Sequence, residues 1–137
     1  RTFATTHIST SIYARKVLLV DDNELILKQM ASILSEEGAH VSVAGSAREA
    51  RRIIAQTPDL DLIISDVVMP GGITGSQLMY EVHSTAPNVA RLLMSGFVPE
   101  EMGHPPQASD EIALLRKPFT RSALMAAVRK ALETARH

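Results

Sequence analysis

The sequence predicts an α/β fold: a doubly wound three-layer sandwich with a central five-stranded parallel sheet. Short apolar runs alternate with segments of helical periodicity along most of the chain, and this alternation is typical of strand–helix–strand units. The run 16–20 is almost continuously apolar, as strands are when helices cover both faces of a sheet. The connections between the segments are short, which favours right-handed crossovers between parallel strands.

The residues at the ends of the predicted elements suit those positions. Gly38 follows the first helix, where a left-handed residue is favoured. Ser46 and Glu49 match a capping box at the start of the second helix, and Thr120 caps the last helix. The predicted strands are 16–20, 40–44, 61–66, 90–94 and 112–115. The predicted helices are about 24–37, 46–56, 75–85 and from 120 onward.

A fourth helix is expected to be short or disrupted. The segment 98–110 contains three prolines and a glycine, and each interior proline costs a helix about 3 kcal/mol. At most one helical turn fits, around 100–102. The sequence therefore predicts four clear helices and one damaged helix around the sheet.

The composition limits the function. The chain has 137 residues, which suits one domain, and a formal net charge of −1 from 14 basic and 15 acidic residues. This balance gives no broad basic surface, so we expect neither nucleic acid nor direct membrane contact. There is no cysteine, which excludes disulfides and thiolate metal sites. Residues 1–15 begin with Arg rather than Met and are interpreted as a linker or a remnant of a longer chain, with the domain at 16–137.

Five polar side chains stand where predicted strands end. Asp21 and Asp22 follow the first strand, Asp66 ends the third, Ser95 follows the fourth, and Lys117 follows the fifth. Because sites of doubly wound sheets form beyond the carboxyl ends of the strands, we expect these groups to converge. Three carboxylates repel each other unless a cation joins them, and an all-oxygen site suits Mg²⁺. A phosphoryl group on an Asp carboxylate would use the cation, the ammonium and the hydroxyl together.

Four motifs in this order resemble the response-regulator receiver domains of two-component signalling. They are VLLVDD at 17–22, LIISDVVMP at 62–70, MSG at 94–96 and RKPF at 116–119. The resemblance extends over about 16–132. It implies a flavodoxin-like fold with strand order 2-1-3-4-5. It also implies a phosphoryl-accepting switch whose partner is a histidine kinase or a histidine phosphotransfer domain, in the cytoplasm.

The resemblance assigns a role to each polar residue. Asp66 is the phosphoacceptor. Asp22 binds Mg²⁺ directly, Asp21 assists partly through water, and the backbone carbonyl of Val68 is the third protein ligand. On the phosphoryl side, Ser95 is the switch hydroxyl and Lys117 pairs with the phosphoryl group, with a cis peptide bond expected between Lys117 and Pro118.

The sequence departs from the family pattern at several places. Leu114 replaces the usual Tyr or Phe, so the aromatic rotamer switch is absent or altered. The loop between Met69 and Gly75 is one residue longer than the commonest form. Val68 and Phe97 are apolar where family members border the path of the attacking water. We therefore hypothesise slow self-dephosphorylation.

Three questions stay open at this point. The run 94–97 and the damaged fourth helix resemble receivers at the C-terminal end of hybrid sensor kinases, whose enzymatic activity would lie outside this domain. A pseudo-receiver that acts only as a protein-interaction module is the alternative, although Asp66, Asp22 and Lys117 are intact. An aspartyl-phosphate phosphatase is disfavoured because Val68 replaces its general acid. Oligomeric state is not predicted.

Overall fold

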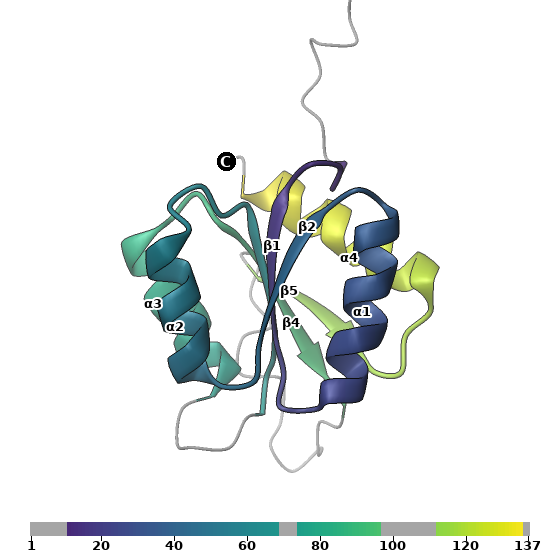
Figure 1. The fold of residues 1–137 in the computed structure, drawn as a ribbon, viewed down its shortest axis with the longest axis horizontal. Coiled ribbons are helices and arrows are strands. Elements are labelled where there is room, and N and C mark those ends of the chain that lie inside the picture. The colour runs from purple at the N-terminus through teal and green to yellow at the C-terminus, as the bar shows by residue number, and fades with distance from the viewer. Residues whose placement is uncertain (1–10, 69–73, 97–111, 136–137) are drawn as a thin grey trace, which may run out of the picture.

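The computed structural model describes residues 11–68, 74–96 and 112–135, and these form a five-stranded, fully parallel sheet of order β2-β1-β3-β4-β5 (Figure 1). This confirms the predicted fold class and strand order. The strands are β1 (Lys16–Val20), β2 (His40–Ala44), β3 (Leu62–Asp66), β4 (Ala90–Ser95) and β5 (Ala113–Arg116). The predicted boundaries differ from these by one residue in β3, β4 and β5.

Helices cover both faces of the sheet. They are α1 (Glu24–Glu36), α2 (Ala47–Gln56), α3 (Gly75–Thr85) and α4 (Arg121–Thr134). Two separate hydrophobic cores result: α1 and α4 pack on one face, and α2 and α3 on the other (Figure 1). The segment 98–110, where a damaged helix is predicted, lies outside the described residues.

The alternation of side chains along β1 explains why its sequence is apolar from Val17 to Val20. Val17 and Leu19 belong to the core beneath α1 and α4, whereas Leu18 and Val20 belong to the core beneath α2 and α3. All four are at most 1% exposed. Successive residues of a strand face opposite sides, so a central strand with helices on both sides needs apolar residues at every position.

Side-chain caps fix where the helices begin. The Asn23 side chain accepts hydrogen bonds from the amides of Leu25 and Ile26, and the Thr120 hydroxyl accepts one from the amide of Ala123. A full capping box occurs between Thr74 and Gln77, at the start of α3. These contacts satisfy amides that the first turn of a helix leaves without partners.

The predicted capping box at the start of α2 forms only in part. Ser46 accepts the amide of Glu49, as expected. The Glu49 carboxylate instead accepts a hydrogen bond from the amide of Gly45, one residue before the cap, with a nitrogen–oxygen distance of 2.8 Å. The cap therefore extends one residue further back than the sequence predicts.

The residues just before β1 pack against the domain. Ile12 is only 3% exposed and lies in the core beneath α1 and α4. The amide of Ala14 donates to the carbonyl of Gly38, which follows the C-cap residue of α1 and has φ +95°. The interpretation of 1–15 as a linker stays a prediction, but its last five residues contact the fold. Among the described helices, none combines the length and hydropathy that a bilayer crossing requires.

Candidate functional site

Three carboxylates meet at the carboxyl edge of the sheet. Asp21 follows β1 and is 1% exposed, Asp66 is the last residue of β3, and Asp22 is exposed to solvent. One oxygen of each lies within 4.8 Å of the others. The parallel topology places the ends of β1 and β3 side by side, as the sequence predicts.

The ammonium of Lys117 joins two of these carboxylates. Its Nζ donates to Asp21 Oδ2 at 2.9 Å and to Asp66 Oδ2 at 3.4 Å. Its backbone amide donates to the carbonyl of Ser95 at 2.8 Å, which ties the end of β5 to the end of β4. Ser95 is 5% exposed, and the Lys117–Pro118 bond is cis, as expected.

The surroundings shift the pKa values of two charged groups, Asp66 and Lys117. Burial raises the pKa of Asp66, and nearby Asp21 adds to this, whereas Lys117 opposes it. Burial alone would lower the pKa of Lys117, but the carboxylates of Asp21 and Asp66 outweigh it and raise that pKa. The negative charge at this edge is therefore only partly compensated.

The donor set fits a hard divalent cation. All three side chains offer oxygen, which is the ligand that Mg²⁺ prefers. Asp21 already uses both oxygens, Oδ1 for the amide of Asn23 and Oδ2 for Lys117. Exposed Asp22 and half-buried Asp66 have capacity left for a cation. The direct role of Asp22 and the assisting role of Asp21 stay predictions.

Gly75, the first residue of α3, is part of the site that sequence reasoning missed. Its amide donates to the carbonyl of Val67 at 2.8 Å. A Cβ atom at this position would lie 1.9 Å from the carbonyl oxygen of Asp66. No local pattern in the sequence marks this contact, because it depends on how closely α3 approaches β3.

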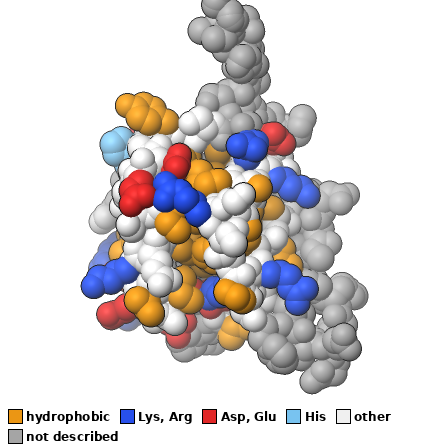
Figure 2. Space-filling view, turned by 90° about the vertical axis from the view of Figure 1, so that its right-hand side faces the viewer, with side chains coloured by type: hydrophobic (Ala, Val, Ile, Leu, Met, Phe, Trp, Pro, Cys, Tyr) orange, Lys and Arg blue, Asp and Glu red, His pale blue; other side chains and the backbone are white. Residues whose placement is uncertain are grey.

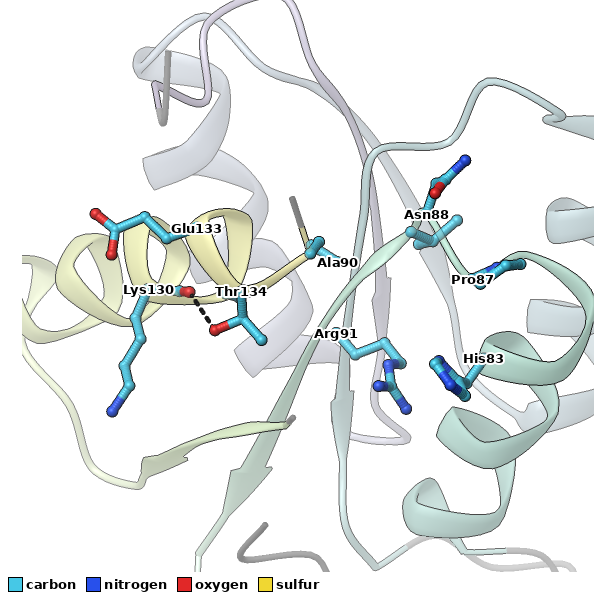
Figure 3. A pocket seen from close by; sticks show the side chains of 11 residues that line it. His83, Pro87, Asn88, Ala90, Arg91, Lys130, Glu133 and Thr134 are labelled. Atoms are coloured by element: carbon cyan, nitrogen blue, oxygen red, sulfur yellow. Dashed lines mark hydrogen bonds between the residues drawn. The ribbon is translucent and has the colours of Figure 1, made fainter. Parts of the chain in front are cut away.

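A hollow of about 590 Å³ lies at the opposite edge of the sheet, between the ends of α3 and α4 (Figure 3). Its lining includes Ala90, where β4 begins, together with His83, Arg91 and Lys130. None of the predicted site residues lines it. The carboxyl edge, rather than this hollow, carries the candidate chemistry.

Comparison with known sequences agrees with the geometry. Residues 17–129 match the family described as "Response regulator receiver domain". The chain is 30% identical over 118 residues to the sensor kinase CckA of Brucella abortus, covering 85% of this chain and 12% of CckA. It is 33% identical over 122 residues to the transcriptional regulatory protein FixJ of Azorhizobium caulinodans, covering 85% of this chain and 54% of FixJ. The chain thus spans only part of the length of these relatives.

Solved structures show the same fold. A receiver domain from Clostridium thermocellum superposes with a TM-score of 0.75 at 29% identity, covering 87% of this chain and 94% of that one. The chemotaxis protein CheY4 of Vibrio cholerae also gives 0.75 at 29% identity, covering 87% and 99%. Because the family match extends over most of this chain, the chain belongs to the response-regulator receiver domains, the phosphoacceptor modules of two-component signalling.

Proposed function

We propose that Asp66 accepts the phosphoryl group, with Mg²⁺ held by Asp22, Asp66 and the backbone carbonyl of Val68. The observation that carries this proposal is the shared Lys117 ammonium, which contacts Asp66 and Asp21, two of the three clustered carboxylates. A site with this many carboxylates stabilises a bound anion only when a cation offsets the negative charge of the carboxylates.

The chemistry is a direct displacement. A carboxylate oxygen of Asp66 forms a bond to phosphorus while the bond between phosphorus and the donor breaks, leaving an acyl phosphate. The cation, when bound, neutralises the developing charge on the phosphoryl oxygens. Lys117 lies close enough to turn from the carboxylate to a phosphoryl oxygen, and Ser95, at the end of the adjacent strand, supplies a hydroxyl donor.

The surface beside the site suits a protein donor. Leu25, in the first turn of α1, is 63% exposed, and Val68, two residues after Asp66, is 66% exposed. Figure 2, which views the side that carries α1 and α4, shows apolar surface between charged side chains. Exposed apolar side chains that border a polar site are typical of a docking surface.

The family supports a proposal for the phosphoryl donor. We propose a phosphohistidine on a histidine kinase or on a histidine phosphotransfer domain, meeting this domain in the cytoplasm. The similarity to CckA, which is named a sensor kinase, favours attachment to a hybrid sensor kinase.

Intact mass measurement tests the proposal. The wild-type chain and the Asp66→Asn variant are incubated in parallel with Mg²⁺ and acetyl phosphate. The expected result is a gain of one phosphoryl group that is lost in the variant and without Mg²⁺. A folded wild-type chain that takes no phosphoryl group, either from acetyl phosphate or from a kinase, would instead favour a pseudo-receiver that only binds other proteins.

A further inference from the structure

Three hydrogen bonds hold the backbone immediately after the proposed phosphoacceptor. The amide of Val67 donates to the carbonyl of Met94 in β4 at 2.8 Å, and the amide of Gly75 donates to the carbonyl of Val67 at 2.8 Å. The hydroxyl of Ser65 donates to the carbonyl of Asp66 at 3.0 Å. Together they anchor the two described ends of the connection between β3 and α3. The predicted extra loop residue lies outside the described residues.

Only one of these three bonds comes from a side chain. Ser65 is 0% exposed, and the preceding Ile63 and Ile64 are also fully buried and apolar. Burying a hydroxyl is unfavourable unless it gains a partner. An apolar residue would pack in this buried strand without that cost. Packing alone therefore does not explain why a hydroxyl stands at position 65.

The surroundings of Ser65 indicate what the hydroxyl does. A Cβ atom on Gly75 would lie 1.9 Å from the carbonyl oxygen of Asp66 and 3.1 Å from Ser65 Oγ. The hydroxyl, this carbonyl and the first residue of α3 are therefore in mutual contact. The orientation of the Asp66 carbonyl decides the direction in which the chain continues to Val68.

We propose that Ser65 is a positioning residue for the cation. By holding the Asp66 carbonyl against α3, its hydroxyl fixes the peptide units that present the Asp66 carboxylate and the Val68 carbonyl. The inference rests on the proposed function, because it assumes that these two groups bind Mg²⁺. Ser65 touches neither the cation nor the phosphoryl group and acts through the backbone.

The test compares Ser65→Ala with a matched control, Ser76→Ala, in the full chain. Ser76 is also buried and adjoins Gly75, but its hydroxyl has no hydrogen-bond partner within 11–68, 74–96 and 112–135. Mg²⁺ is titrated without any phosphoryl donor, followed by amide NMR shifts. We expect roughly fivefold weaker Mg²⁺ binding in Ser65→Ala, the factor that one ordinary hydrogen bond contributes. Hydrogen exchange at the Gly75 amide should be faster, and Ser76→Ala should match wild type in both.

The outcomes separate this inference from the proposed function. Ser65→Thr retains the hydroxyl and should restore Mg²⁺ binding, whereas a merely structural role predicts no recovery beyond that of stability. Wild-type Mg²⁺ affinity in a folded Ser65→Ala chain overturns the inference, even if wild type is phosphorylated normally. A wild-type chain that binds Mg²⁺ but takes no phosphoryl group overturns the proposed function, while the titration still decides the role of Ser65. Absence of Mg²⁺ binding in wild type overturns both.

Discussion

Replacing Gly75 by alanine probes how strongly the start of α3 sets the geometry of the site. The added Cβ would stand 1.9 Å from the carbonyl oxygen and 2.9 Å from the carbonyl carbon of Asp66. Carbon–oxygen contacts in proteins are about 3.3 Å or longer, so α3 and the end of β3 must separate by roughly 1.4 Å. Both obstructing atoms belong to the backbone, and no rotamer change relieves the contact.

The displacement should affect both stability and phosphorylation. Overpacking of this kind costs about 1–3 kcal/mol, which urea unfolding measures. A misplacement of about 1 Å in a reacting group costs on the order of 100-fold in rate. We therefore expect the rate of mass gain with acetyl phosphate and Mg²⁺ to fall by about that factor in Gly75→Ala.

Gly45→Ala is the matched control for this substitution. A Cβ at Gly45 would meet only the carboxylate of Glu49, at 3.9 Å, so this variant should keep wild-type stability and rate. Gly75→Ala with a wild-type phosphorylation rate would refute the reasoning. A variant that is destabilised but phosphorylated normally would show that α3 contributes to the fold without setting the position of Asp66.

Three further predictions follow from single side chains. Because burial raises the pKa of Asp66, its folded-state stability contribution is present at low pH and is lost as the pH rises through that raised pKa. Without Mg²⁺, the unfolding midpoint of Asp66→Asn should therefore rise relative to that of wild type as the pH increases above the ordinary pKa of an aspartate. Ile12→Ala should lower the free energy of unfolding by about 2–4 kcal/mol in urea titrations, since Ile12 is 3% exposed; a change below about 0.5 kcal/mol would show that 11–15 add nothing. Val68→Asn should shorten the phosphoryl lifetime followed by intact mass, because a polar side chain can orient the attacking water; an unchanged lifetime would contradict the slow-dephosphorylation hypothesis.

The predictable part of the site is the part that topology alone determines. Asp21, Asp66, Ser95 and Lys117 follow or end strands, and parallel strands deliver their carboxyl ends to one edge. Identifying the strands was therefore enough to bring these side chains together. The register of β3 against β4 places Asp66 opposite Met94, the residue before Ser95.

Features that depend on distance between elements were not predictable. The burial of Ile12 is hidden in a polar, Thr- and Ser-rich context, and it becomes evident only when α1 and α4 enclose it. The role of Gly75 depends on a contact with β3 that no local pattern reports. Ser65 reads in the sequence as an ordinary interruption of an apolar strand, whereas the structure gives its hydroxyl a specific acceptor.

The charges at the carboxyl edge explain why we expect phosphorylation to require a bound divalent cation. Three carboxylates and one ammonium give the site a formal charge of −2, which a divalent cation would neutralise. Transfer to Asp66 then exchanges a single negative charge for the larger charge of an acyl phosphate. Without the cation, Lys117 would have to compensate Asp21 and the phosphoryl group at once, although its Nζ already lies closer to Asp21 Oδ2, at 2.9 Å, than to Asp66 Oδ2, at 3.4 Å. A bound cation would therefore leave Lys117 available to the phosphoryl group, and under our two proposals the backbone that presents Asp66 and Val68 sets how well the cation is held.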